Sequence, residues 1–481
     1  MTLDDLFDQG VPAGAGGVPV TGLTSDSRKV GPGTVFAALQ GSLADGQDFI
    51  PDALARGAVA ILTDRPADTG EVPLVRADEP RRALALAAAR LHPGQPEILV
   101  AVTGTNGKSS SVDFLRQIWS RGGYAAASMG TLGAVGPAGR LELGHTTPDP
   151  VAVHATLDTL AGQGVSHCAM EASSHGLAQY RLDGVRLSAV AFTNLTQDHL
   201  DYHPSMEAYR AAKLRLFSEL APPGIPAVVN ADSPESQHFA EAAGAAGLAP
   251  FSVGWRGRDL KIEELMPKAV GQALFLNHAG REVRVDLPLI GEFQALNALT
   301  AAGLALSLGM DFEAVASGLS ALKPVKGRME FVGQTRAGAP VFVDYAHTPD
   351  GLDVLLRAVR PHTSGRLFVV FGCGGDRDRT KRPLMGAVAG RQADRVIVTD
   401  DNPRTEAAEA IRAAILQGVP EAQEMPDRAE AIRAAVAELR AGDTLVIAGK
   451  GHETGQIVGD RVLPFSDQET AAEALREASH G

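Results

Sequence analysis

Short apolar runs alternate with alanine-rich stretches of helical spacing along most of the chain. Runs such as 98–102 and 367–371 contain only aliphatic and aromatic residues. A parallel strand that is buried on both faces has such a continuous apolar sequence. It needs a crossover connection, usually a helix, to reach the next parallel strand. The pattern therefore predicts an α/β fold whose sheets are largely parallel.

Two breaks rich in proline and glycine, at 92–96 and 321–327, interrupt this alternation. A chain of 481 residues is also too long for one ordinary hydrophobic core. We therefore predict three domains, at 1–96, 97–325 and 326–481. We expect a smaller N-terminal α/β domain, a central P-loop-type domain with a mostly parallel sheet, and a Rossmann-like C-terminal domain.

The stretch AVTGTNGKSSS, residues 101–111, places a glycine-rich loop between an expected strand at 98–102 and an expected helix at 109–119. Only two residues separate Gly104 from Gly107, whereas the usual P-loop has four between its glycines. Such a turn directs backbone N–H groups and a helix N-terminus at one point, which favours a phosphate. Lys108 would add a positive charge and Ser109 a hydroxyl for Mg²⁺. The alternative is a glycine-rich turn that binds nothing.

The formal net charge of -13, with no block rich in Lys and Arg, argues against nucleic acid and against an anionic membrane surface. The two cysteines, Cys168 and Cys373, are too few for a disulfide framework. Residues 1–10 are acidic where a signal peptide would be basic and then apolar. No window reaches the roughly 18 uninterrupted apolar residues of a membrane span. We expect a cytoplasmic protein with no membrane insertion.

Polar residues follow the expected strands of the middle domain, at the edge where ligands bind in open α/β sheets. Glu171 comes directly after the run 165–170, and His199 lies in the segment after 188–192. Both are candidate ligands for Mg²⁺ beside a bound phosphate. A helix-capping acid and a surface histidine are the alternative. Lys213 belongs to a helical pattern at 206–217, where a lysine is usually exposed.

The last domain repeats this arrangement after four apolar runs. The polar tips are 344–349, 372–382, 399–404 and 449–453. Parallel strands would bring the four tips to one edge, where their mixed charges suit a zwitterion, although each tip alone could be an ordinary charged loop. The segment 372–374 is a poor dinucleotide motif, because Arg377 replaces its third glycine.

These residues resemble the Mur ligases, whose phosphate loop has the short form Gly-Thr-Asn-Gly-Lys-[Ser/Thr], as at 104–109. The resemblance extends in order along nearly the whole chain. Further matches are 26–28, 45–46, 146–148, 171–181, 198–203, 291–297, 327–330 and the four C-terminal tips. Two positions depart from the family pattern: Gln47, where relatives often have His or Arg, and His145, where some have Asn.

The resemblance implies ATP-driven amide bond formation in peptidoglycan precursor synthesis. A substrate carboxylate would attack the γ-phosphate to give an acyl phosphate and ADP, and an amine would then displace phosphate. The implied partners are ATP, Mg²⁺, UDP-N-acetylmuramoyl-L-Ala-D-Glu and a diamino acid, and we expect a monomer. The domains would bind, in chain order, the UDP end, ATP and the amino acid, with domain closure during the reaction.

The resemblance also implies roles for individual residues. Lys108, Lys213 and His199 would be catalytic. ATP would be bound by Gly104, Thr105, Asn106, Gly107, Lys108, Ser109, Ser110, Asn297, Arg328 and Asp344. Metal ligands would be Ser109, Glu171, His199 and Lys213 as a carbamate. The UDP substrate would be held by Ser27, Thr146, Thr147, Ser173, Gln179 and Arg181, and the amino acid by Arg377, Asp401, Asn402, Pro403, Arg404, Gly449 and Glu453.

Among diamino acids we choose meso-2,6-diaminopimelate, because in the family a tip such as 401–404 accompanies it and Arg404 can hold its distal carboxylate. Ala407 and Ala408 depart from the usual Asp-Pro, and L-lysine and L-ornithine stay open. Two other functions are weighed. Folylpolyglutamate synthase shares the short loop but lacks the tip at 401–404 and the type of N-terminal domain. A P-loop ATPase without ligase chemistry would leave the four tips unexplained.

Overall fold

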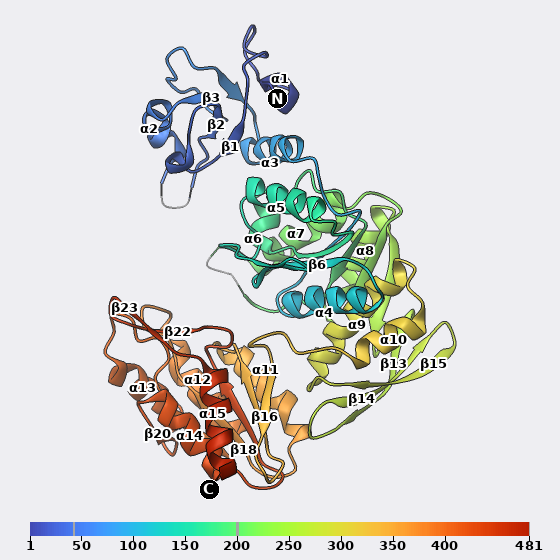
Figure 1. Cartoon of the computed structure of the whole chain (residues 1–481), viewed down its shortest axis with the longest axis vertical. Helices are drawn as coiled ribbons and strands as arrows, with labels where there is room; N and C mark the ends of the chain where they lie inside the picture. Colours follow the sequence, from blue (N-terminus) through green and yellow to red (C-terminus); the bar gives the residue numbers. More distant parts are fainter. Residues whose placement is uncertain (42–43, 199–201, 481) are drawn as a thin grey trace. The chain divides into compact units, whose positions relative to one another are not determined.

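The computed structural model describes residues 1–41, 44–198 and 202–480 (Figure 1). Its internal contacts divide the chain into two compact units, Met1–Lys261 with Asn297–Gly318, and Ile262–Leu296 with Leu319–Gly481. This division does not test the predicted domain boundaries near 96 and 325, which stay a prediction. Among the described residues, no helix is long and apolar enough to cross a membrane.

The first unit begins with a four-stranded parallel sheet in the order β1-β2-β3-β4. Side chains of β2 and β3 alternate between two apolar clusters, so that Val35 packs with Leu84 while Phe36 packs with Ile50 on the other face. The strands are β1 (Gly22–Thr24), β2 (Thr34–Ala37), β3 (Ala58–Thr63) and β4 (Leu74–Arg76), and the helices are α1 (Leu3–Leu6), η1 (Ser27–Lys29), η2 (Gly46–Phe49), α2 (Ile50–Ala55) and α3 (Pro80–Leu91).

The larger sheet of the first unit has the strand order β12-β11-β10-β5-β9-β6-β7-β8. Strands from β12 to β6 are parallel, and β7 and β8 are antiparallel. Its strands are β5 (Ile98–Thr103), β6 (Ala126–Gly130), β7 (Gly133–Gly136), β8 (Gly139–Leu141), β9 (His167–Glu171), β10 (Ala189–Phe192), β11 (Pro226–Asn230) and β12 (Ala249–Gly254). Its helices are α4 (Lys108–Arg121), α5 (Pro150–Gly162), α6 (Ser174–Ala178), α7 (Met206–Arg215), the π-helix η3 (Leu216–Leu220) and α8 (Ser236–Ala245).

The expected strand at 98–102 and helix at 109–119 are confirmed as β5 and α4. Strand β5 lies between β9 and β10, with Val100 opposite both Ala169 and Ala189. Because the three strands are parallel, their carboxyl ends meet at one edge of the sheet. The loop after β5 therefore lies between the segments that begin at 171 and 193.

Three elements are divided between the two units along the chain. They are β13 (Leu260–Pro267), α9 (Glu292–Ser307) and α10 (Phe312–Ser320). The second unit also holds an antiparallel hairpin of β14 (Gln272–His278) and β15 (Arg281–Leu287).

The main sheet of the second unit has six strands in the order β16-β17-β21-β18-β19-β20. All pairs are parallel except β16 with β17. Its strands are β16 (Glu330–Gln334), β17 (Pro340–Asp344), β18 (Leu367–Phe371), β19 (Arg395–Val398), β20 (Gln423–Glu424) and β21 (Thr444–Ala448), followed by the hairpin of β22 (Gly455–Val458) and β23 (Arg461–Pro464). Its helices are α11 (Pro349–Val359), η4 (Arg360–His362), α12 (Lys381–Gln392), α13 (Ala408–Leu416), α14 (Arg428–Glu438) and α15 (Asp467–His480).

Helices cover both faces of this sheet. Leu356 of α11, Met385 of α12 and Ile411 of α13 share one apolar cluster, whereas Ile432 of α14 and Leu475 of α15 share another. The four expected strands are confirmed as β17, β18, β19 and β21, which are adjacent and parallel. Their carboxyl ends therefore bring the four polar tips to one edge, as the α/β pattern predicts.

Candidate active site

The loop after β5 needs both of its glycines. Gly104 has φ +150°, and a Cβ at this residue would lie 1.9 Å from Thr193 Oγ1. Gly107 has φ +85°, and its Cβ would lie 2.1 Å from Asn297 Oδ1. At either residue, a larger side chain would clash with these atoms. Residues other than glycine also rarely adopt such positive φ angles. The loop thus passes closely between Thr193 and Asn297, two polar residues of the same unit.

Lys108, the first residue of α4, contacts the loop after β5. Its Nζ donates hydrogen bonds to the carbonyl oxygens of Gly104 at 2.8 Å and Thr105 at 2.7 Å. The Asn106 carbonyl accepts a bond from Thr193 Oγ1 at 2.6 Å. Ser109 and Ser110 follow in the first turn of α4, where backbone N–H groups have no partner within a helix. The loop can therefore offer an anion both N–H donors and an ammonium group.

Lys213 of α7 reaches the same loop from another direction. Its side chain is buried, and Nζ donates to the Gly104 carbonyl at 2.8 Å and lies 4.5 Å from the ring centre of Tyr209. The Tyr209 hydroxyl lies 3.2 Å from Thr105 Oγ1. Burial, together with the positive charge of Lys108, lowers the pKa of Lys213 well below that of an ordinary lysine. Lys213 therefore differs from the usual helical lysine, whose side chain is exposed.

Glu171 is buried at the end of β9 and is held by a residue that the sequence did not single out. Its Oε1 accepts a bond from the Thr131 N–H at 2.8 Å, and its Oε2 accepts one from Thr131 Oγ1 at 3.3 Å. His199, the other predicted ligand, lies outside the described residues. Within the part that the structure describes, no three His, Cys, Asp or Glu residues form a group that could hold a metal ion. The magnesium site stays a prediction.

The predicted sugar-peptide residues form one hydrogen-bonded group around Thr147. Its Oγ1 donates to the Glu171 carbonyl at 3.0 Å and accepts from the Ser173 N–H at 3.1 Å. Arg181 donates to the Thr147 carbonyl at 2.6 Å and to Gln179 Oε1 at 2.7 Å. Thr146 joins the group because its hydroxyl lies 3.0 Å from Thr131 Oγ1. Five of the six residues predicted to hold the UDP substrate are thus brought together.

Two cavities open beside this group, within the first unit. One of about 100 Å³ is lined by Ser25, Leu39, Arg81, Leu84, Asp149, Pro150, Gln179 and Arg181. The other, of about 190 Å³, shares Ser25 and Asp149 with it and is also lined by Asp26. Ser27, the sixth predicted residue, is the buried first residue of η1 and follows Asp26 directly. Arg81 and Asp149 are lining residues that the sequence did not predict.

Arg328 and Asp344 belong to the second unit. The Asp344 carboxylate, at the end of β17, accepts bonds from the Met329 and Ala346 N–H groups, both at 2.7 Å. Burial raises the pKa of Asp344, although the charge of Arg328 opposes this effect. The Arg328 guanidinium lies 4.8 Å from the ring centre of Tyr345. Both predicted ATP contacts therefore lie next to the first of the four tips.

A buried lysine joins two of the predicted amino-acid-binding residues. Lys450 Nζ donates to Asn402 Oδ1 at 2.9 Å and lies 3.3 Å from Glu453 Oε2. The Asn402 side chain also donates to Glu453 Oε2 at 2.9 Å. Lys450 has no exposed side-chain surface and was not among the predicted site residues. The tip at 449–453 is thereby fixed against the tip at 399–404.

The other predicted amino-acid-binding residues gather at the same edge. Arg404 has φ +52°, and its guanidinium donates to the Gly375 carbonyl at 2.8 Å. The Asn402 carbonyl accepts from the Gly375 N–H at 2.9 Å, and Pro403 follows it. Arg377 is exposed two residues after Gly375. Asp401 lies beside Asn402, and the Gly449 N–H donates to the Asp344 carbonyl at 3.1 Å.

Comparison with known proteins gives matches along most of the chain. Residues 19–95, 102–305 and 327–451 match the models for the Mur ligase family catalytic domain, the Mur ligase middle domain and the Mur ligase glutamate ligase domain. A relative from Chelativorans sp. (strain BNC1) is 54% identical over 466 residues, which cover 96% of each chain. The chain belongs to the Mur ligase family.

That relative is named UDP-N-acetylmuramoyl-L-alanyl-D-glutamate--2,6-diaminopimelate ligase. A solved structure with the same name is 33% identical, has a TM-score of 0.77 and matches 99% of each chain. Folylpolyglutamate synthase from Mycobacterium tuberculosis, complexed with ADP and AMPPCP, is 20% identical, has a TM-score of 0.61 and covers 77% of this chain and 92% of its own. The last likeness concerns the fold alone. The expected α/β class and family are confirmed.

Thr131 and Tyr209 were not predicted as site residues, and Lys450 was predicted only as part of the tip at 449–453, although each has a local signal in the sequence. Tyr209 precedes Lys213 by four residues on α7, so the two side chains share a helix face. Thr131 directly follows β6, and Lys450 lies two residues after β21. Residues just beyond parallel strands are where ligands and their supporting groups lie, so this position could have marked Thr131 as it marked the tip that contains Lys450.

Proposed function

We propose that this Mur ligase joins meso-2,6-diaminopimelate to the D-glutamate of UDP-N-acetylmuramoyl-L-Ala-D-Glu, with ATP and through an acyl phosphate. The observation that carries the proposal is the group of charged residues at the carboxyl edge of the second unit's sheet. There Arg404, Asp401 and Glu453 lie on tips that are hydrogen-bonded to one another. The name of the relative at 54% identity supports the same amino acid.

Diaminopimelate has a carboxylate and an ammonium at each end, and the edge offers groups of both signs. The buried Asp401 carboxylate would suit an ammonium. The Arg404 guanidinium is a planar fork that can hold a carboxylate with two parallel bonds. Lysine and ornithine lack the distal carboxylate, so they would leave this fork without its partner. Glu453 would accept the distal ammonium.

The phosphate loop is suited to ATP. Its N–H groups and Lys108 would bind the β- and γ-phosphates, and Asn297, Arg328 and Asp344 would contact the adenine, the phosphates and the ribose. Offsetting the charge of the transferred phosphoryl group is the main task of such a site. The substrate carboxylate would attack the γ-phosphate, and the amine would then attack the acyl carbon and release phosphate.

The donors around the loop also fit Mg²⁺, which prefers oxygen ligands. Ser109 offers a hydroxyl and Glu171 a buried carboxylate, and His199 would complete the set. Bound Mg²⁺ supplies positive charge against the phosphate oxygens. Lys213 would become an oxygen donor as well: its neutral amine adds to CO₂ and loses a proton, which gives a carbamate. The depressed pKa of Lys213 supports this reaction, because only the neutral amine is nucleophilic.

The group around Thr147 would hold the sugar-peptide part of the second substrate. Ser27 and the segment 41–46, of which residues 42 and 43 lie outside the described residues, would hold its uridine diphosphate. Arg181 and Gln179 line the 100 Å³ cavity, which supports a role in contacting this substrate.

The test is product formation with three amino acids offered separately. The purified chain is incubated with ATP, Mg²⁺ and UDP-N-acetylmuramoyl-L-Ala-D-Glu, and the UDP-linked product is identified by mass spectrometry. We expect the highest kcat/KM with meso-diaminopimelate. A preference for L-lysine or L-ornithine would overturn the choice of amino acid. Phosphate release without any amide product would favour the ATPase alternative.

A further inference from the structure

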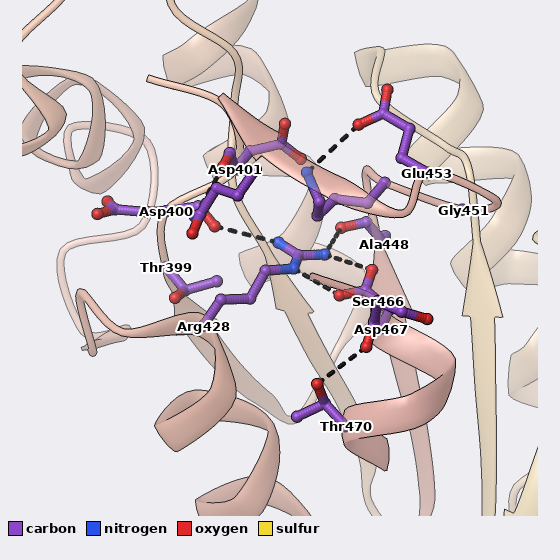
Figure 2. A network of polar contacts seen from close by, with 12 residues as sticks. Thr399, Asp400, Asp401, Arg428, Ala448, Gly451, Glu453, Ser466, Asp467 and Thr470 are labelled. Atoms are coloured by element: carbon purple, nitrogen blue, oxygen red, sulfur yellow. Dashed lines mark hydrogen bonds and ion pairs between the residues drawn. The ribbon is translucent and has the colours of Figure 1, made fainter. Parts of the chain in front are cut away.

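Arg428 and Asp467 form a buried ion pair behind the amino-acid-binding tips (Figure 2). Each is the first residue of a helix, Arg428 of α14 and Asp467 of α15. The pair is bidentate, with Nε 2.7 Å from Oδ1 and Nη2 2.8 Å from Oδ2. Both side chains have 0% exposed surface. A pair so fully removed from water depends on this geometry, because each charge alone would be costly to bury.

The remaining donors of Arg428 reach the backbone of two tips. Nη2 donates to the Ala448 carbonyl at 2.9 Å, and Nη1 donates to the Asp400 carbonyl at 3.4 Å. Ala448 directly precedes Gly449, and Asp400 directly precedes Asp401. Figure 2 shows the guanidinium between these two carbonyl groups. One rigid planar group therefore binds the residue that precedes Asp401 and the residue that precedes Gly449.

The start of α15 makes a second connection to the same tips. Gln468, next to Asp467, donates from Nε2 to the Gly451 carbonyl at 2.8 Å. The tip at 449–453 is thus held by Arg428 before Gly449 and by Gln468 after Lys450. The helix that supplies the acid of the ion pair also fixes the middle of this tip.

Stability alone does not account for the pair. Replacing a buried ion pair by apolar residues of similar volume is often neutral or stabilising. The pair does, however, fix the distance between two loops, and a site for a zwitterion depends on such distances to within about 0.5 Å. Resting on the proposed function, we infer that Arg428 and Asp467 are positioning residues that set the spacing of Asp401 and Asn402 from Gly449 and Glu453, and so determine binding of the diamino acid.

The test uses two variants of the pair. Arg428→Lys keeps the charge but loses the planar fork, and the double variant Arg428→Met with Asp467→Leu keeps the volume but removes both charges. We expect each to raise KM for meso-diaminopimelate about 10- to 100-fold, the range that a misplaced binding group costs. KM for ATP and for UDP-N-acetylmuramoyl-L-Ala-D-Glu should stay near the parent value. The double variant keeps the test valid if Arg428→Lys folds poorly.

Arg366→Met provides the matched control. It breaks the Arg366–Asp443 pair, whose Nη2 and Oδ2 atoms are 2.8 Å apart, next to the amino ends of β18 and β21 in the same sheet. This variant should leave all three KM values near those of the parent. Equal increases for all three substrates in the Arg428 variants, or no increase, would overturn the inference. A parent that prefers another amino acid would contradict the proposed function instead, and the same comparison of KM values would then be made with that amino acid.

Discussion

Lys213 and Lys450 are buried lysines, and each donates a hydrogen bond to a residue that the sequence assigns to binding. The resemblance to the family singled out Lys213, but its burial could not be read from one helical position. Arg428 and Asp467 could not be predicted at all, because the partners are 39 residues apart and neither lies in a motif. Side-chain partners distant in sequence depend on how the helices pack, which local patterns do not encode.

Arg404→Ala tests the choice of diaminopimelate. The loss of one ionic hydrogen bond of about 1.5 to 3 kcal/mol should lower kcat/KM for meso-diaminopimelate about 10- to 150-fold. L-Lysine has no distal carboxylate, so its low kcat/KM should hardly change. Arg391→Ala, which removes an exposed arginine on α12, is the control. An equal loss with both amino acids would count against the assigned role of Arg404.

Lys213→Ala tests the carbamate. We expect the variant to lose most turnover, since it can form no anionic oxygen ligand at this place. In the parent, ¹³C-bicarbonate should give a carbamate carbon signal by NMR, and the signal should be missing from the variant. Lys268→Ala, at an exposed lysine, should keep both the signal and the activity. Near-normal turnover of Lys213→Ala would refute the carbamate.

At the level of helices and strands, the buried parallel strands were predictable because their apolar runs are continuous. The hairpin of β22 and β23 was not predicted from the sequence. It contacts the tip at 399–404, because the Arg404 N–H donates to the Ile457 carbonyl at 3.0 Å. All four residues of β23 are exposed, so no alternation of buried and exposed side chains marks the strand. Turn η3 continues α7 as a π-helix, a change of hydrogen bonding that composition does not reveal.

The family departure at Ala407 falls on the N-cap of α13. Ala407 makes no side-chain cap hydrogen bond. Ala407→Asp should therefore stabilise the protein by about 0.5 to 2 kcal/mol, because the new carboxylate can accept from free N–H groups of the first turn. Thermal unfolding should show a higher Tm. Ala413→Asp, which places the same side chain in the exposed middle of α13, should lower it; a rise in both variants would contradict the capping explanation.

Glu406 links the tip at 401–404 to α12. Its carboxylate pairs with Arg382 at 2.9 Å and accepts from the Asp376 N–H at 2.6 Å. These bonds lower the pKa of Glu406 from 4.5 to about 2. A depressed pKa contributes stability that is fully present above pH 4.5 and is lost as the pH falls toward 2.

The free energy of unfolding should accordingly fall more steeply between pH 4.5 and 2 in the parent than in Glu406→Gln. Denaturant unfolding at several pH values measures this difference. Glu409→Gln, at an acidic residue in the first turn of α13, serves as the control and should keep the parent slope. Parallel curves for the parent and Glu406→Gln would show that the ionised Glu406 contributes nothing.

For the whole molecule, the order of motifs along the chain identified the family, and the fold and comparisons confirm it. The net charge of -13 is compatible with anionic substrates because the positive groups are local, as at Lys108 and Arg404. The contacts divide the chain into two compact units, and the predicted ATP contacts Arg328 and Asp344 belong to the second. The sequence could not indicate this division, because it depends on contacts between distant segments.

The most direct test of the central claim follows one oxygen atom. UDP-N-acetylmuramoyl-L-Ala-D-Glu is labelled with ¹⁸O in its glutamate carboxylates and incubated with ATP, Mg²⁺ and meso-diaminopimelate, and the released phosphate is examined by ³¹P NMR. Ligation through an acyl phosphate predicts that one ¹⁸O atom passes into each phosphate as the amide forms. Unlabelled phosphate, or phosphate released at the same rate without the amino acid, would contradict the account.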